Sequence, residues 1–264
     1  MIRLLFISLL FISCTGNTSQ SAQAEGPSYQ EQLKLANPDT LLVGIQDKIY
    51  DVFVQSVVSQ DKSSLVQLSD QLTELNKTEG QPIITYWRAY LQFYFSIFYL
   101  KNSDKENAEK EIDKGIELLE ELKKRNSEDN ALLAMLQGFG IQFKGLKAMV
   151  ISMDIKSNIK QAIAQDSTNL RAYYVYGSND FHTPKKYGGG KKAEQYLLKA
   201  ISLPAQKVKN PYLPSWGKEE SYELLIKLYI KEEKWGLAKK YFQEGISKFP
   251  ESYTINQLAP KLVD

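Results

Sequence analysis

Residues 222–250 read YELLIKLYIKEEKWGLAKKYFQEGISKFP and carry two helical patterns in succession. The first pattern has apolar residues at helical steps, namely Tyr222, Leu225, Ile226 and Tyr229. The second has small and aromatic residues at similar steps before a proline, namely Ala238, Phe242, Gly245 and Pro250. Each set of steps places its residues on one face of a helix. The segment therefore predicts two antiparallel helices joined by a short turn.

This order of residue types resembles a tetratricopeptide repeat. Aromatic and aliphatic positions lie on the first helix, and small, aromatic and small positions followed by proline lie on the second. Gly245 stands where the family usually has alanine. The resemblance implies that Ala238 and Gly245 are packing positions, because small side chains let the two helices of a unit approach closely.

Weaker copies of the pattern extend the resemblance over roughly residues 80–250. Their signature residues are Trp87, Tyr90, Leu91, Tyr94, Ala108, Ile112 and Gly115; Ala134, Gly138, Ile141, Ile155, Ile159 and Ala162; and Tyr173, Tyr176, Gly177, Ala193, Leu197 and Ala200. Helical periodicity alone adds a hairpin over 39–78, and Ser103 with Glu106 has the spacing of a capping box. The resemblance implies an all-α superhelix of stacked antiparallel helix hairpins, a TPR-like α-solenoid. The alternative is an irregular helical bundle in which only the last unit is a repeat.

Composition excludes several classes of protein. The 264 residues are 43% hydrophobic and 24% charged, which is ordinary for a globular chain. A net charge of +2 gives no reason to expect a nucleic-acid partner. A single cysteine cannot form an intramolecular disulfide, and a single histidine cannot build an imidazole metal site. The sequence therefore predicts neither a metal nor a cofactor.

The N-terminus has the pattern of an export signal. Arg3 precedes an apolar run, Leu4 to Ile12, that is too short to span a bilayer as a helix. The following residues, Phe11-Ile12-Ser13-Cys14, resemble the lipobox of bacterial lipoproteins. The alternative is that Cys14 is only a small residue near an ordinary signal-peptidase site.

The lipobox resemblance implies the organisation of the whole chain. Residues 1–13 would be a lipoprotein signal peptide, and Cys14 would be acylated and become the mature N-terminus. Residues 14–38 are polar and predict a flexible tether, which leaves 39–264 for the helical-repeat domain. Because Thr15 is not aspartate, the resemblance favours an outer membrane over the inner one, with the domain at the periplasmic face.

The segment from Phe181 to Lys192 is the most unusual in the chain. Its three glycines followed by lysine suggest a phosphate loop, but no Ser or Thr follows Lys191 and no strand precedes the segment. A long turn between two helices is the simpler interpretation. A similar insert occurs in periplasmic repeat lipoproteins that resemble the T component of tripartite periplasmic (TRAP) transporters. No nucleophile-elbow motif is present, and the sequence predicts no catalytic site.

The tetratricopeptide resemblance also implies which side chains line the inner groove. Carried over by the repeat phase, they are Arg88, Gln92, Phe95, Met135, Phe139, Phe143, Arg171, Tyr174, Ser178 and Phe181. A phase error of one residue would move half of them into the core. Arginine beside aromatic residues suits a peptide carboxylate or an acidic small molecule.

Three functions are compatible with this sequence. The first is a non-enzymatic, lipid-anchored scaffold that binds a protein or peptide at the periplasmic face of the outer membrane. The second is a small-molecule-binding accessory lipoprotein associated with a transporter, and the third is an uncharacterised enzyme. An open concave groove would favour the first, and a closed pocket lined by Phe139, Phe143 and Tyr174 would favour the second. The sequence predicts neither the partner nor the oligomeric state.

Overall fold

The computed structural model describes residues 40–262, and this part of the chain is helical without a strand. Its α-helices are α2 (Ile45–Ser59), α3 (Ser63–Glu79), α4 (Pro82–Lys101), α5 (Lys105–Glu120), α6 (Ser127–Gly140), α7 (Ala148–Gln165), α8 (Leu170–His182), α9 (Ala193–Ser202), α10 (Lys218–Lys231), α11 (Trp235–Lys248) and α12 (Tyr253–Asn256). Short 3-10 turns are η1 (Thr40–Leu42), η2 (Ile141–Phe143), η3 (Gly145–Lys147), η4 (Lys185–Tyr187) and η5 (Ala259–Lys261). The predicted signal peptide and tether lie outside the described residues.

Several helices begin at side chains that cap them. Asn126 and Asp129 form a capping box at the start of α6, where Asn126 accepts from the amide of Asp129 and Asp129 accepts from the amide of Asn126. At α5 the predicted capping box is wrong, because Asp104 is the N-cap and accepts from the amide of Asn107 at 3.0 Å. Ser103 instead has a φ of 62° in the preceding turn. Caps of this kind satisfy amides that lack a partner within the helix.

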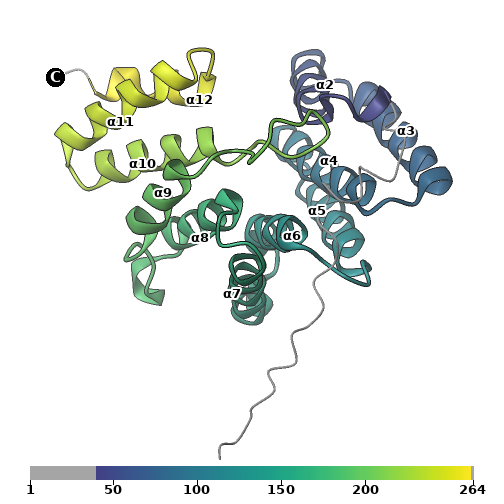
Figure 1. Ribbon diagram of the computed structural model, residues 1–264, viewed down its shortest axis with the longest axis horizontal. Coiled ribbons are helices and arrows are strands. Elements are labelled where there is room, and N and C mark those ends of the chain that lie inside the picture. Colours follow the sequence, from purple (N-terminus) through teal and green to yellow (C-terminus); the bar gives the residue numbers. More distant parts are fainter. Residues whose placement is uncertain (1–39, 263–264) are drawn as a thin grey trace, which may run out of the picture.

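The helices pack as hairpins that follow one another around an arc. Consecutive helices pair as α4 with α5, α6 with α7, α8 with α9 and α10 with α11, and each first helix also contacts a neighbouring hairpin. Figure 1 shows the arc from α2 to α12, with α4, α6 and α8 on its inside and α3, α5 and α7 on its outside. The all-α superhelix of helix hairpins expected from the sequence is confirmed.

Small residues allow the two helices of a hairpin to approach closely. A Cβ atom at Gly177 would lie 2.7 Å from Cγ of Leu197, and one at Gly115 would lie 3.1 Å from the carbonyl oxygen of Ala89. The repeat positions Ala108, Ala162, Ala193, Ala200 and Ala238 are fully buried. The regular placement of these small residues is therefore a consequence of packing, as the sequence pattern implied.

Replacing Ala238 by leucine should lower the free energy of unfolding by about 1–3 kcal/mol. Ala238 is fully buried on α11, so three extra carbon atoms would have to displace its neighbours. Thermal unfolding followed by circular dichroism measures the effect. Gly236→Ala is the control on the same helix, because a Cβ atom there meets nothing within 4 Å. Equal melting curves for the two variants would contradict the assigned packing.

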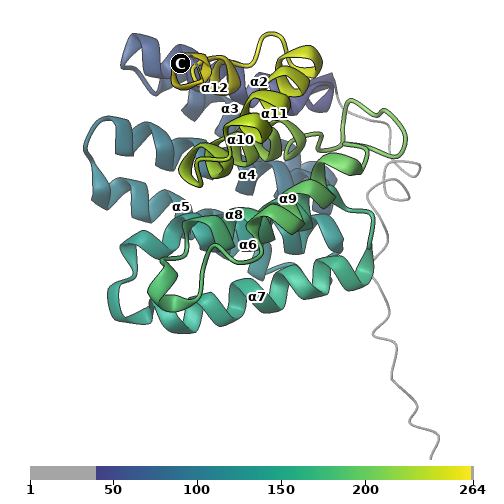
Figure 2. The same cartoon turned by 90° about the vertical axis from the view of Figure 1, so that its left-hand side faces the viewer.

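The long connection between α9 and α10 contacts the N-terminal helices. Residues 203–217, called the strap here, leave α9 and reach the start of α2 and α4 before α10 begins (Figures 1 and 2). The amide of Gly44 donates to the carbonyl of Pro211 at 2.9 Å, and Nε1 of Trp87 donates to the carbonyl of Tyr212 at 3.0 Å. The side-chain oxygen of Gln46 accepts from the amides of Ser215 and Trp216 at 2.8 and 3.0 Å. The strap thus joins the segment between α9 and α10 to the N-terminal helices α2 and α4.

None of the helices within residues 40–262 combines the length and the apolar character that crossing a bilayer requires.

Candidate functional site

A continuous series of aromatic rings covers the inside of the arc. Tyr94 on α4 is its centre, with ring centroids 4.9 Å from Phe53, 5.4 Å from Phe93 and 5.3 Å from Tyr90. The series continues from Phe93 to Phe139 at 5.0 Å and then to Phe143 at 6.4 Å. In the other direction it runs from Tyr90 through Trp216 of the strap to Tyr174 at about 6 Å per step. We call this set, together with Tyr50, the inner aromatic surface.

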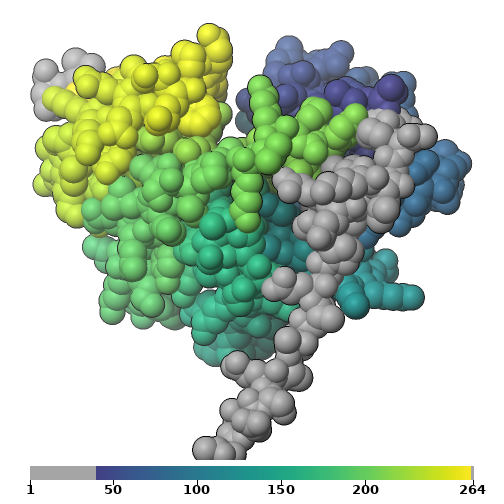
Figure 3. All heavy atoms as spheres, viewed as in Figure 1, coloured from purple at the N-terminus to yellow at the C-terminus, as the bar shows by residue number. Residues whose placement is uncertain are grey.

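The inner aromatic surface is layered. Phe53, Tyr90 and Trp216 are buried and form its base, whereas Phe93, Tyr94, Phe139, Phe143 and Tyr174 are partly exposed. Tyr50, whose ring lies 6.2 Å from that of Tyr94, is 48% exposed at the edge. Figure 3 shows an open notch between the atoms of α10 to α12 and those of α2. Partly exposed aromatic rings from several helices form a surface that can bind another molecule.

The tyrosine hydroxyls of this surface remain neutral. The hydroxyls of Tyr90 and Tyr94 are hydrogen-bonded at 3.3 Å, and Nε1 of Trp216 donates to the hydroxyl of Tyr86 at 2.9 Å. Burial raises the pKa of Tyr94 and Tyr174 above the ordinary value of 10. These groups therefore supply neutral donors and acceptors beside apolar ring faces.

Three glutamates on α10 lie beside the inner surface, and one of them, Glu223, is paired with Lys227. Glu219, Glu220 and Glu223 are partly buried on the first turns of the helix and raise the pKa of nearby tyrosines, among them Tyr94 and Tyr174. The carboxylate of Glu220 accepts from the amide of Gly217 at 2.7 Å and so caps α10. Burial nevertheless raises the pKa of Glu220 to about 7, and the negative charges of Glu219 and Glu223 add to this rise.

Stability should fall as pH rises from about 4.5 to about 7, because of Glu220. In that range the folded protein keeps a proton on Glu220 that the unfolded chain has already released, so rising pH favours the unfolded chain. Glu220→Gln keeps an acceptor for the amide of Gly217 and removes the titration. We expect the melting temperature of the wild type to fall by several degrees more than that of Glu220→Gln over this range. Parallel curves would contradict the raised pKa.

Arg171 lies under the inner surface and serves the fold. It is only 5% exposed, and its guanidinium donates to both carboxylate oxygens of Glu128 on α6. It also donates to the carbonyls of Ala205 and Trp216 in the strap, at 2.9 and 3.3 Å. The predicted role of Arg171 in recognising an acidic ligand is therefore replaced by a structural one, in which it joins α6, α8 and the strap.

The predicted groove residues divide into two groups. Phe139, Phe143 and Tyr174 lie on the inner aromatic surface. On α4, however, Gln92 faces α5, since its Cβ lies 3.1 Å from where a Cβ of Gly115 would stand. Phe95 is buried, and Arg88 is partly buried and interacts electrostatically with Glu121, which follows α5. The predicted phase on α4 is wrong, and Tyr90, Phe93 and Tyr94 take the inner positions.

The remaining predicted residues are not part of the inner aromatic surface. Met135 is partly buried and packs against the first hydrophobic core. Ser178 lies one turn beyond Tyr174, with its hydroxyl 3.4 Å from Nδ1 of His182. Phe181 packs against the second core, which α9 to α12 build, and Nζ of Lys231 lies 5.2 Å from its ring centroid. Tyr174 contacts both cores, so it marks the junction between the two halves of the arc.

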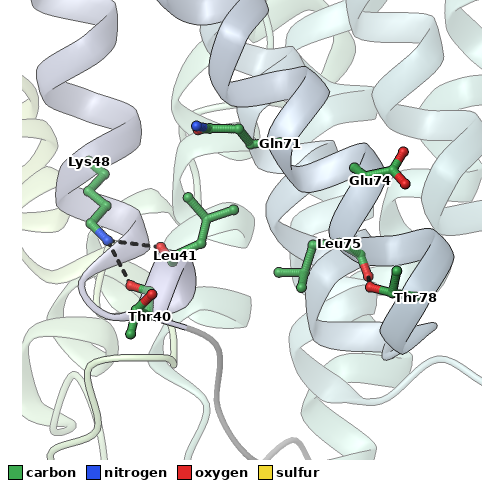
Figure 4. A pocket seen from close by; sticks show the side chains of 7 residues that line it. All are labelled: Thr40, Leu41, Lys48, Gln71, Glu74, Leu75 and Thr78. Atoms are coloured by element: carbon green, nitrogen blue, oxygen red, sulfur yellow. Dashed lines mark hydrogen bonds between the residues drawn. The ribbon is translucent and has the colours of Figure 1, made fainter.

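A separate cleft of about 610 Å³ opens between η1, α2 and α3. The residues that line it are Thr40, Leu41, Lys48, Gln71, Glu74, Leu75 and Thr78 (Figure 4). Nζ of Lys48 donates to the carbonyls of Thr40 and Leu41 at 3.1 and 3.0 Å, so this cation already holds the start of the described chain. Within residues 40–262 no group of His, Cys, Asp and Glu is arranged to hold a metal ion.

Comparisons with known proteins bear on the fold. No protein-family model matches the chain, and no curated protein matches its sequence. Among solved structures, the HusA haemophore from Porphyromonas gingivalis is similar with a TM-score of 0.51, covering 74% of this chain and 96% of that one. The two sequences are 20% identical, and at this level the likeness concerns the fold alone.

Proposed function

We propose that this protein is a non-enzymatic binding protein that is lipid-anchored through Cys14 at the periplasmic face of an outer membrane. Its inner aromatic surface would bind a segment of a protein or peptide partner in a TPR-like manner. The observation that carries the proposal is the partly exposed series of rings from α2, α4, α6 and α8 inside an open arc. Aromatic side chains dominate protein-binding surfaces because they offer a large contact area at a low cost in entropy.

The charges of the surface indicate the chemistry of the partner. Glu219 and Glu223 raise the pKa of Tyr94 and Tyr174 respectively and so lie beside the rings, whereas Arg171 is already paired with Glu128. A carboxylate ligand would be repelled by the glutamates, and a lysine or arginine side chain would be attracted. We therefore propose a segment with apolar and basic side chains, in place of the acidic ligand that the sequence suggested.

Site-specific photo-crosslinking in intact cells tests the binding role. A photoreactive amino acid replaces Tyr50 at the edge of the inner surface in one variant and Tyr253 on α12 in the control variant. Both tyrosines are exposed, so the two probes have similar access to solvent. We expect a discrete adduct from position 50. Adding Glu219→Gln and Glu223→Gln together should reduce the amount of this adduct. Equal adducts from both positions, or none at 50, would exclude the inner surface as the binding site.

The second candidate function is that of a small-molecule-binding accessory lipoprotein of a transporter. It is supported by the flat ring faces of the surface and by the similar solved structure, which is that of a haemophore. Haemin is therefore the ligand to test, by titration of the purified protein and measurement of tryptophan quenching. Haemin that quenches the wild type at low concentration, and does not quench the double variant Tyr94→Ala with Tyr174→Ala, would favour this candidate. Quenching that is unchanged in this variant would exclude it.

The lipid anchor makes its own prediction. Metabolic labelling with an acyl analogue should mark the wild type and leave Cys14→Ala unlabelled, because Cys14 is the single cysteine of the chain. Two or three acyl chains would hold the protein on a membrane lastingly, since each buried methylene contributes about 0.8 kcal/mol. The labelled protein should separate with outer-membrane fractions. Equal labelling of both proteins would rule out acylation at Cys14.

A further inference from the structure

The outward face of α7 is apolar over its first turns. Leu146 in η3 is 102% exposed, and Met149, Val150 and Met153 on α7 are 77%, 56% and 62% exposed. Their spacing of three and four residues places them on one face, which we call the α7 apolar face. The opposite side of the helix is buried through Ile155, Ile159 and Ala162. The exposed side chains are therefore not needed to hold α7 in place.

A lysine-rich loop lies at the same end of the superhelix. Residues 183–192, called the lysine loop here, join α8 to α9, and Figures 1 and 2 place them near the start of α7 on the neighbouring hairpin. Lys185, Lys186, Lys191 and Lys192 are exposed in this loop. Tyr187 is 72% exposed, and Nζ of Lys186 lies 4.9 Å from its ring centroid.

The lysine loop has a defined conformation. The carboxylate of Asp180 accepts from the amides of Lys192 and Ala193 at 2.8 and 2.9 Å, and its carbonyl accepts from the amide of Gly190 at 2.9 Å. A Cβ atom at Gly189 would lie 2.0 Å from the carbonyl oxygen of Thr183, so this position requires glycine. The glycines thus fold the loop back on α8 and present its lysines together, instead of binding a phosphate by themselves.

The two segments that carry the apolar face and the lysine loop are poor in acidic residues. The sequence has no Asp or Glu from residue 130 to 153 or from 181 to 193, and Asp154 follows the apolar face. Lys144 pairs with Glu109 and Asp113 of α5 at 2.8 and 2.6 Å, so it adds no positive charge to the surface. Lys147 directly follows Leu146 in the chain, and Lys147 and the four lysines of the loop are exposed. Apolar residues bordered by lysines match the acyl and phosphate layers of a lipid surface.

We propose that the α7 apolar face and the lysine loop form a membrane-binding surface that inserts into the headgroup region of an anionic bilayer. The flexible Leu and Met side chains would enter the acyl boundary, while the lysines would pair with lipid phosphates. The surface lies on the outside of the arc, so it leaves the inner aromatic surface accessible. It acts independently of the proposed acyl chains on Cys14 and would fix the orientation of the domain on the membrane.

A local fluorescence probe tests insertion. In the full chain carrying Cys14→Ala, Met149→Cys provides a single labelling position for an environment-sensitive dye. Val208→Cys is the control, because Val208 is also apolar and exposed but belongs to the strap between α9 and α10. Vesicles of phosphatidylcholine with phosphatidylglycerol should shift the emission of the probe at 149 to the blue and leave the probe at 208 unchanged. No shift at 149, or equal shifts at both positions, would overturn the proposal.

Charge variants test the lysines separately. Replacing Lys185, Lys186, Lys191 and Lys192 by glutamine should weaken binding to anionic vesicles at least tenfold, since each lysine near such a surface contributes to the attraction. The matched control replaces Lys123 and Lys124 after α5 and Lys207 and Lys209 in the strap, all of which are exposed. Equal losses in both variants would indicate only a nonspecific charge effect. A shift of the probe at 149 by soluble polyglutamate, without one by vesicles, would instead indicate an acidic protein partner and overturn the proposal.

Discussion

Arg171→Ala should lower the free energy of unfolding by about 3–5 kcal/mol, because it removes one partner of a mostly buried ion pair. Glu128 would keep its charge in a partly buried position, with a side chain 22% exposed, and lose its bidentate partner. The carbonyls of Ala205 and Trp216 would lose their donors at the same time. Urea unfolding followed by circular dichroism measures the change, which is a large part of the stability of an ordinary domain.

Arg88→Ala is the matched control for Arg171→Ala. Arg88 is only partly buried and interacts with Glu121 at the surface. Its loss should therefore lower the free energy of unfolding by less than about 1 kcal/mol. Arg171→Lys should lie between the two, since lysine keeps the charge but cannot bind both carboxylate oxygens in a planar fork. Equal unfolding curves for Arg88→Ala and Arg171→Ala would contradict the role of Arg171 in the fold. A binding test that removes Arg171 would therefore confuse loss of affinity with loss of structure.

The hairpins were predictable because their cause is local. Small residues at fixed steps, such as Ala238 and Gly245, are required wherever two neighbouring helices meet closely, and each hairpin carries its own copy of that requirement. Helical periodicity and proline positions give the same boundaries within a few residues, as Pro82 does at the start of α4. Because the periodicity and the boundary residues agree, the fold could be predicted from a single sequence.

The phase of α4 was not predictable, because nearly every side of this helix is apolar. α4 packs against α2, α3 and α5 and also lies beneath the strap, so its residues Ile83, Tyr86, Trp87, Tyr90, Leu91, Phe95 and Phe98 are all buried. A helix with one buried face reveals its orientation through its polar residues, and α4 offers few of them. Gln92 is itself buried beside α5, so its polarity pointed to the wrong face.

The strap was not predictable for a different reason. Its contacts join residues far apart in the chain, such as Trp216 with Tyr86 and Ser215 with Gln46. Local sequence periodicity cannot predict such contacts. Its prolines and lysines have the composition of an ordinary surface loop. Trp216, two residues before α10, was the one signal that could have revealed the packing of the strap, because large aromatic residues in loops are usually packed.

Trp216→Ala should lower the free energy of unfolding by about 3–5 kcal/mol, the range for removing a large buried aromatic side chain. Trp216 stacks at 6.1 Å on Tyr90, contacts Tyr174 at 6.0 Å and donates to the hydroxyl of Tyr86. Trp216→Phe keeps part of the ring contact but loses the hydrogen bond and three buried ring atoms, so it should cost less than Trp216→Ala. Trp235→Ala on α11 is the control, since Trp235 is exposed and its loss should have little effect.

The same substitution should also change how the protein unfolds. The first hydrophobic core extends from α2 to α8 and includes Trp216, whereas the second belongs to α9 through α12. Stacked hairpins contact only their neighbours, so their cooperativity depends on each interface, and the strap adds a contact between distant hairpins. Calorimetry should therefore show one transition for the wild type and an earlier, separate transition of the C-terminal hairpins in Trp216→Ala. A single transition that only moves to lower temperature would mean that the interface of α8 and α9 with α10 couples the two cores without the strap.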